Sequence, residues 1–205
     1  MKFLSKQKLF PKKKLSQYFL VDDQVLQLIL ETADIHSHET ILEVGAGTGV
    51  LTEALLRKGG KVVAIEKDDT LAQKLQRLQN GRLTIICGDI FEYKTLSFDK
   101  VVANLPYHIS TFFLQNFLPL GKPMTLLLSK ETAEKCVATP KEKRKYGFLS
   151  LFCQFYASVI LVSVVNRKAF YPQPKALSAL VHFLPKKTFS IDAAGFLKFL
   201  KRVNI

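Results

Sequence analysis

The sequence alternates short apolar segments with amphipathic helical patterns along most of its length. Seven segments have the pattern of strands: Ile41–Val44, Lys61–Glu66, Leu83–Cys87, Lys100–Asn104, Met124–Ser129, Ser158–Val165 and Leu177–Leu184. Helical patterns lie before and between them, at Asp22–Thr32, Leu51–Lys58, Asp69–Gln79, Ser110–Phe117, Glu131–Val137 and Phe148–Tyr156. Such alternation predicts an α/β fold, with a seven-stranded, mostly parallel sheet and helices on both faces. Asp22 or Asp23 is expected to cap the first helix, and Asp68 the third.

The chain also carries a large excess of positive charge. It has 30 Lys and Arg residues against 17 Asp and Glu, a formal net charge of +13 over 205 residues. This balance favours polyanionic partners, either nucleic acid or an anionic membrane surface. Three basic stretches are candidates for phosphate contacts: Lys2–Lys14, Lys141–Lys145 and Lys198–Arg202.

Cysteine and histidine placement predicts neither disulfides nor a metal site. Cys87, Cys136 and Cys153 are far apart and form no Cys-x-x-Cys pair. We therefore expect buried, reduced thiols in a cytoplasmic protein, with no metal. The first 14 residues hold six lysines and no apolar core, which is not the pattern of a secretory signal.

One nearly apolar stretch, Phe148–Val165, approaches the length of a membrane span. It contains four polar residues, and its composition shifts from Leu and Phe to β-branched residues. That shift favours a buried helix followed by a buried strand over a membrane segment.

A glycine-rich loop, Glu43-Val44-Gly45-Ala46-Gly47-Thr48-Gly49, follows the first predicted strand. Glycine lets the backbone turn sharply and approach a ligand closely. A tight turn alone would give the same local pattern. The spacing differs from the Gly-x-Gly-x-x-Gly pattern of dinucleotide sites, which favours a ligand without a pyrophosphate.

Two acidic residues follow the next predicted strands. Glu66 ends the second strand and is placed to accept hydrogen bonds from ribose hydroxyls, while Asp89 follows the third and is placed to accept from an adenine amine. Either acid alone is typical of a helix cap or an exposed charge. Because the carboxyl ends of parallel strands share one edge of a sheet, the acids and the glycine loop together indicate an adenosyl ligand.

The segment Asn104-Leu105-Pro106-Tyr107, after the fourth strand, has the composition expected for chemistry on an amine. An adenine amine is a weak nucleophile because its lone pair is delocalised. The Asn104 side-chain oxygen and the Leu105 or Pro106 carbonyl are suited to hold its hydrogens, and Tyr107 offers a ring for stacking. In isolation the segment is also typical of a turn.

A second stacking ring is expected on energetic grounds. Extruding a base from a duplex costs a few kcal/mol, and each aromatic contact returns about 1–3 kcal/mol. The proline-rich segment Phe170-Tyr171-Pro172-Gln173-Pro174-Lys175 supplies it. Phe170 is the first choice for this ring, and Tyr171 the alternate.

Together these segments resemble the class I S-adenosylmethionine methyltransferases, and within them the ribosomal RNA adenine N6-dimethyltransferases. The resemblance covers Lys12 to Val181 and includes Lys14–Leu20, Asn104–His108 and Phe170–Lys175. It is nearest to the dimethyladenosine transferases of the small subunit. It implies a class I Rossmann-like fold, S-adenosylmethionine as cofactor, and N6-methylation, in the dimethyl form, of adenine in small-subunit ribosomal RNA or its precursor during ribosome maturation.

The resemblance also implies roles for individual residues. Gln17 would contact the methionine end of the cofactor, Gly45 and Gly47 would pass beneath it, and Glu66 and Asp89 would hold the ribose and the adenine. The full cofactor set is Gln17, Phe19, Leu20, Glu43, Gly45, Gly47, Glu66, Lys67, Asp89, Ile90 and Asn104. The catalytic set is Asn104, Leu105, Pro106, Tyr107 and Phe170.

The chain departs from the family pattern at several positions. Ser16 and Tyr18 replace the usual Gly and Asn or His, and Leu177 replaces an aspartate. Tyr18 is expected to narrow the mouth of the cofactor site. We expect a basic arm with a cofactor-contacting segment at 1–21, the methyltransferase domain at 22–186, and at 187–205 the start of a C-terminal helical domain that is truncated or missing.

Three other functions are consistent with parts of this pattern. An antibiotic-resistance type of methyltransferase would act on a large-subunit adenine. A non-catalytic ribosome-assembly or transcription factor could keep the same fold. A dehydrogenase is a more distant alternative. We expect a monomer without membrane association.

Overall fold

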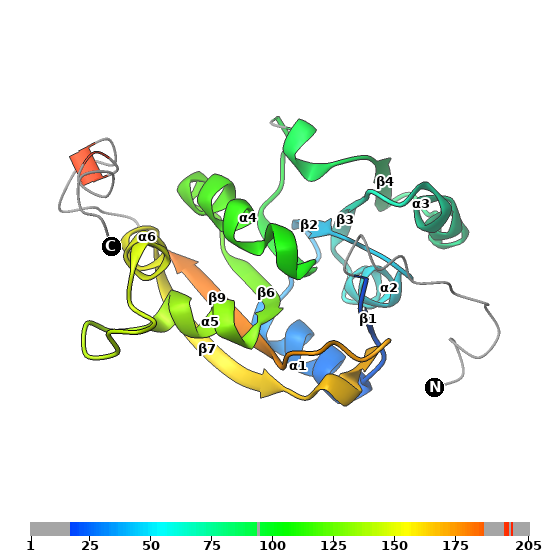
Figure 1. Cartoon of the computed structure of the whole chain (residues 1–205). Helices are drawn as coiled ribbons and strands as arrows, with labels where there is room; N and C mark the ends of the chain where they lie inside the picture. The colour runs from blue at the N-terminus through cyan, green and yellow to red at the C-terminus, as the bar shows by residue number, and fades with distance from the viewer. Residues whose placement is uncertain (1–16, 94, 187–194, 197, 199–205) are drawn as a thin grey trace.

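A computed structural model describes residues 17–93, 95–186, 195, 196 and 198. Its centre is a seven-stranded sheet in the order β4-β3-β2-β5-β6-β9-β7 (Figure 1). The strands are β2 (Thr40–Val44), β3 (Lys61–Glu66), β4 (Leu83–Cys87), β5 (Lys100–Asn104), β6 (Met124–Ser129), β7 (Ala157–Val165) and β9 (Ser178–Pro185). The helices are α1 (Asp23–Ala33), α2 (Val50–Arg57), α3 (Asp69–Leu75), α4 (Ser110–Phe117), α5 (Lys130–Val137) and α6 (Phe148–Tyr156).

The sheet confirms the predicted α/β class. Strands β4, β3, β2, β5 and β6 pair in parallel, and β9 runs antiparallel to both of its neighbours, β6 and β7. The strand order has its switch point at β2. β3 and β4 follow on one side of β2, and β5 and β6 follow on the other. In open parallel sheets, ligands bind beside this switch point, at the carboxyl ends of the strands.

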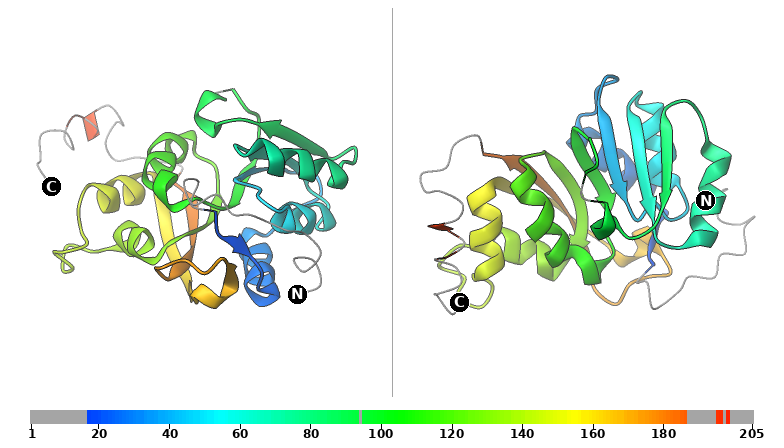
Figure 2. Two further views of the ribbon diagram at one scale, coloured as in Figure 1. Left: turned by 45° about the vertical axis from the view of Figure 1, so that its right-hand side comes forward. Right: turned by 90° about the horizontal axis from the view of Figure 1, so that it is seen from above.

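Helices cover both faces of the sheet, and each face has its own core (Figure 2). Apolar residues of α1, α2 and α3, including Ile29, Leu55 and Leu75, pack on one face. Residues of α4, α5 and α6, including Phe113 and Phe152, pack on the other. All five side chains are buried, so burial of apolar surface on both faces holds the sheet rigid.

Capping residues fix where two of the helices begin. The Asp22 carboxylate accepts hydrogen bonds from the backbone amides of Gln24 and Val25, at 2.9 and 3.1 Å. Asp68 accepts from the Thr70 amide at 3.1 Å at the start of α3. These caps confirm the predicted starts. Helix α3 is shorter than predicted, because a 3-10 turn at Gln76–Leu78 replaces its last turn.

The apolar stretch Phe148–Val165 forms α6 followed directly by β7. No helix within the described ranges has the length and apolar character needed to cross a bilayer. The prediction that β7 is buried is wrong for its outward residues: Ile160 and Val164 are 47% and 48% exposed, because β7 is an edge strand. Cys87 is likewise exposed at the end of the opposite edge strand, β4, whereas Cys136 and Cys153 are buried.

A separate two-stranded sheet joins β1 (Phe19–Leu20) to β8 (Phe170–Tyr171). The strands are antiparallel, with Phe19 opposite Tyr171 and Leu20 opposite Phe170. This pairing, absent from the sequence prediction, brings the segment before α1 beside the proline-rich segment. The predicted arm before Gln17, and all but three residues of the predicted C-terminal segment, lie outside the described residues.

Candidate active site

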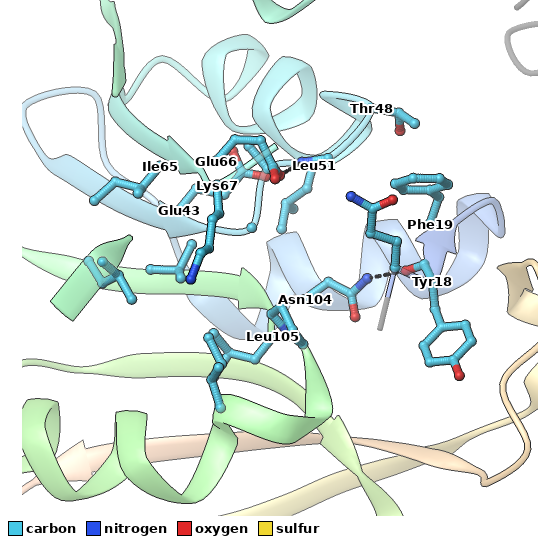
Figure 3. Close-up of a pocket in the computed structure, with 18 of the residues that line it drawn as sticks. Tyr18, Phe19, Glu43, Thr48, Leu51, Ile65, Glu66, Lys67, Asn104 and Leu105 are labelled. Carbon is cyan, nitrogen blue, oxygen red and sulfur yellow. Dashed lines mark hydrogen bonds between the residues drawn. The ribbon is translucent and has the colours of Figure 1, made fainter. Parts of the chain in front are cut away.

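A pocket lies at the carboxyl ends of β2, β3, β4 and β5, beside the switch point of the sheet (Figure 3). The structure brings every predicted cofactor residue to its wall: Gln17, Phe19, Leu20, Glu43, Gly45, Gly47, Glu66, Lys67, Asp89, Ile90 and Asn104. Three of the predicted catalytic residues, Leu105, Pro106 and Tyr107, line it as well. Segments that are far apart in the sequence therefore meet around one cavity.

The glycine-rich loop forms the floor of this pocket in a backbone conformation that other residues rarely adopt. Gly45 and Gly47 have φ angles of 73° and 57°. A Cβ atom on Gly47 would lie 3.2 Å from the ring of Phe19, and one on Gly45 would lie 3.3 Å from the Cδ of Pro106. The two glycines thus allow the N-terminal segment and the Pro106 loop to close against the floor.

Glu66 ties this loop to the end of β3. Its carboxylate accepts hydrogen bonds from the backbone amides of Gly47 and Asp68, at 2.7 and 2.8 Å. The side chain is 6% exposed, and burial raises the pKa of Glu66 although both amide hydrogen bonds act in the opposite direction. Its two oxygens are therefore held in place and keep further lone pairs directed at the pocket.

Glu43 lies deeper, at the end of β2, and is 1% exposed. Burial, together with the nearby Glu66 carboxyl, raises the pKa of Glu43 to about 8. Its Oε2 atom is buried and has no hydrogen-bond partner within the described part of the chain. A buried carboxyl of this kind is neutral at pH 7 and has unused hydrogen-bonding capacity.

Asp89, which follows β4, lines the pocket and forms an ion pair with Lys67. The Lys67 Nζ lies 2.8 Å from Asp89 Oδ2, and this hydrogen bond holds the pKa of Asp89 below its usual range. The other oxygen, Oδ1, accepts from the Phe91 amide at 3.1 Å. Asp89 therefore presents a fixed, ionised carboxylate beside Ile90.

Asn104 is oriented by a contact with the N-terminal segment. Its Nδ2 donates a hydrogen bond to the backbone carbonyl of Tyr18, at 2.8 Å (Figure 3). The amide oxygen is thereby directed away from Tyr18, and no described residue donates a hydrogen bond to it. Asn104 therefore offers an acceptor at the pocket wall.

The two carbonyls that follow Asn104 differ in their availability. The Pro106 carbonyl already accepts from the Ile109 amide at 3.1 Å and from the Ser110 hydroxyl at 3.3 Å. The Leu105 carbonyl accepts no hydrogen bond from the described residues. The sequence did not decide whether the Leu105 or the Pro106 carbonyl is the second acceptor. Within the described part of the chain, the Leu105 carbonyl is the one whose lone pairs accept no hydrogen bond.

Two aromatic rings meet beside this loop. The Tyr107 hydroxyl shares a hydrogen bond of 2.5 Å with the Ser178 hydroxyl, and its ring centroid lies 5.5 Å from that of Tyr18. Burial raises the pKa of the Tyr107 phenol, which keeps it neutral at pH 7. The role of Tyr18 here was not predicted beyond a narrowing of the mouth, because its neighbour Tyr107 is distant in the sequence.

The structure does not bring Phe170 to the pocket, so the prediction of Phe170 as the second ring needs correction. Its side chain is 2% exposed and packs in the core with residues of α1 and α2. Successive residues of a strand point to opposite sides, and its neighbour Tyr171 is 53% exposed. Pairing with Leu20 turns Phe170 inward.

Fold and site together define a class I methyltransferase: a Rossmann-like sheet with a glycine-rich floor and two acids at consecutive strand ends. The model of the ribosomal RNA adenine dimethylase family matches residues 10–203. The chain belongs to this family.

Individual relatives agree with this family assignment. The chain is 37% identical to the ribosomal RNA small subunit methyltransferase A of Chlamydia caviae, with 97% of this chain and 74% of the relative covered. Identity to the protein of the same name from Protochlamydia amoebophila is 36%, with 96% and 74% covered.

Solved structures show the same fold. A dimethyladenosine transferase from Plasmodium falciparum superposes with a TM-score of 0.74 at 32% identity, covering 87% of this chain and 65% of that one. The 23S rRNA methyltransferase ErmE also gives a TM-score of 0.74, at 24% identity, covering 89% and 76%. The chain thus spans about two thirds to three quarters of these proteins.

Proposed function

We propose that this protein transfers methyl groups from S-adenosylmethionine to the N6 amine of adenine in small-subunit ribosomal RNA, up to the dimethyl product. The observation that carries the proposal is that one pocket is lined by two pairs of residues. Glu66 and Asp89 are the acceptors proposed for the cofactor, and Asn104 and Tyr107 are the residues proposed to receive the target base. An adenosyl group and an extruded adenine would then share a single cavity.

The pocket suits the cofactor in shape and in chemistry. Gly45 and Gly47 let the Pro106 and Phe19 side chains pack closely against the loop that lines the pocket. Glu66 and Asp89 offer carboxylate acceptors for ribose hydroxyls and an adenine amine. The Oε2 atom of Glu43, which has no hydrogen-bond partner among the residues that the structure describes, is a further acceptor or donor beside the pocket. When bound, S-adenosylmethionine supplies an electrophilic methyl group, so no side-chain nucleophile is needed.

The protein's own residues would prepare the amine. Asn104 Oδ1 and the Leu105 carbonyl would each accept a hydrogen bond from the two N6 hydrogens. This arrangement favours the pyramidal nitrogen whose lone pair can attack. Tyr107 would stack on the adenine ring, and its bond to Ser178 holds the ring before the base arrives.

The small subunit is favoured over the large subunit by the names of the two chlamydial relatives. The two chlamydial proteins are named for the small subunit and are 36% and 37% identical, against 24% for the 23S enzyme ErmE. A non-catalytic role on the same fold is disfavoured, because the acceptors and the pocket acids are all in place. We further propose that the protein acts as a cytoplasmic monomer.

The test is methyl transfer from tritiated S-adenosylmethionine onto immature small ribosomal subunits, followed by nucleoside analysis of the RNA. We expect the label in N6-methylated and N6,N6-dimethylated adenosine. Large subunits serve as the parallel substrate, and primer extension on both RNAs locates the modified bases. Label in large-subunit adenine alone would reassign the substrate. Absence of label in both would contradict an enzymatic function.

A further inference from the structure

Tyr18 contacts two of the residues to which the proposed chemistry is assigned, Asn104 and Tyr107, and it does so through different atoms. Its backbone carbonyl accepts the hydrogen bond from Asn104, and its ring lies against the ring of Tyr107. In Figure 3 the ring of Tyr18 extends away from the glycine-rich loop, while the ring of Phe19 lies near Thr48 of that loop. The alternation expected of an extended segment accounts for this division.

The position of Tyr18 is fixed by the contacts of the residues that follow and precede it. The next residues form β1, which pairs with β8, so the backbone is held beside the proline-rich segment. On its N-terminal side, Gln17 donates a hydrogen bond of 3.0 Å to the carboxylate of Asp68, the residue that caps α3. The segment is therefore anchored at both ends, and Tyr18 is held between the anchors.

The distance between the rings of Tyr18 and Tyr107 excludes an adenine stacked between them. Two rings with an adenine stacked between them would be separated by about 7 Å, twice the rise between stacked bases. The centroids of Tyr18 and Tyr107 are 5.5 Å apart, with the rings tilted by 34°. The rings are thus in direct contact, an arrangement that is itself favourable for aromatic pairs. The Tyr18 ring therefore packs against the Tyr107 ring, and it does not stack on the other face of the adenine.

We propose that Tyr18 is a positioning residue for the target base, whose ring holds the Tyr107 ring in the orientation that receives the extruded adenine. This inference rests on the proposed function. Among the described residues, the hydroxyl of Tyr107 has a single hydrogen-bond partner, Ser178, and that one side-chain bond leaves the ring free to tilt about the contact. The ring of Tyr18 supplies the second contact. The backbone carbonyl of Tyr18 meanwhile holds the acceptor of Asn104 toward the same base.

Substitution of the ring separates this role from a contribution to the cofactor site, which Tyr18 also lines. Tyr18→Leu removes the ring and leaves the backbone carbonyl. We expect kcat/KM for ribosomal RNA to fall about tenfold, the worth of an aromatic pair, with the Kd for S-adenosylmethionine and the Tm unchanged. Tyr18→Phe keeps the ring and is expected to restore wild-type kinetics, because no described residue bonds to the Tyr18 hydroxyl.

Each alternative result is distinguishable. Wild-type kcat/KM in Tyr18→Leu would overturn the inference and leave the proposed function intact. A loss of activity that is matched by an equal rise in the Kd for S-adenosylmethionine would assign Tyr18 to the cofactor and also overturn it. If wild-type protein methylates no RNA, the proposed function fails. In that case the inference fails with it, whereas wild-type kcat/KM in Tyr18→Leu refutes the inference alone.

Discussion

The side-chain amide of Asn104 donates a 2.8 Å hydrogen bond to the backbone carbonyl of Tyr18, 86 residues earlier in the chain. An amide can present its nitrogen or its oxygen to a given neighbour. Because the nitrogen is held by a carbonyl, the oxygen is the atom left for a ligand. The N-terminal segment therefore determines what Asn104 offers at the carboxyl end of β5.

Replacement of Asn104 by alanine is expected to abolish methyl transfer while cofactor binding changes little. The variant loses one of the two acceptors for the amine, and removal of one such group costs about 10²–10³-fold in rate. Methyl transfer and calorimetric binding of S-adenosylmethionine would be measured in parallel. Asn116→Ala is the matched control, because Asn116 is exposed on α4. Full activity in Asn104→Ala would refute the assignment of Asn104.

Glu66→Gln is expected to weaken cofactor binding about tenfold, the equivalent of one hydrogen bond to a charged group. The carboxylate accepts from two backbone amides, of Gly47 and Asp68. A glutamine can accept through its oxygen only, so its NH₂ group would face one of these donors and disturb the loop. Isothermal titration with S-adenosylmethionine measures the change. Glu131→Gln, at an exposed site on α5, is the control, and equal affinities in the two variants would contradict the prediction.

Glu43 is expected to make the stability of the protein depend on pH. Its pKa is raised from 4.5 to about 8 in the folded state. Between these values the native protein retains a proton that the unfolded chain releases, so the free energy of unfolding falls as pH rises. The limiting slope is about 1.4 kcal/mol per pH unit, and the decline ends above the folded-state pKa.

Glu43→Gln removes this proton exchange while nearly preserving the shape of the side chain. Urea denaturation across that pH window should show a flatter stability profile for the variant than for the wild type, and a greater stability near the alkaline end. Other groups titrate in both proteins, so the difference between the two profiles is the quantity of interest. Parallel profiles would show that Glu43 is ionised in the folded state.

Long periodic elements could be predicted from the sequence, and short or non-local ones could not. β3, β4, β5 and β6 have the predicted bounds. β3, β5 and β6 are inner parallel strands with continuous apolar runs, and β4 keeps a short apolar run although it is an edge strand. The pocket residues that follow the strands, such as Gly45, Glu66, Asp89 and Asn104, were predictable because strand ends share one edge of the sheet. Gln17, Phe19 and Leu20 were predicted from the family resemblance alone. The two-residue strands β1 and β8 have no periodicity to detect. The inward turn of Phe170 follows from their pairing, and the contact between Tyr18 and Tyr107 depends on tertiary packing.

The basic loop between α5 and α6 is expected to contact RNA phosphates. Lys141, Lys143, Arg144 and Lys145 are all exposed there, and Lys145 also lies 3.2 Å from the Glu134 carboxylate. If the protein neutralises about six phosphates, RNA affinity should fall on the order of a thousandfold between about 50 and 200 mM salt. Replacing Lys141, Lys143 and Arg144 by alanine would leave about three contacts and reduce that fall to roughly 20–40-fold.

The control must remove the same charge from another face. Arg57, Lys58 and Lys61 are exposed beside the amino end of β3, at the edge of the sheet opposite the pocket. Their replacement by alanine lowers the net charge equally, so it corrects for the general attraction between a basic protein and RNA. Filter binding over a salt series would measure both slopes. Identical slopes for the two triple variants would mean that the α5–α6 loop makes no phosphate contacts of its own, because only direct contacts release counterions at a particular site.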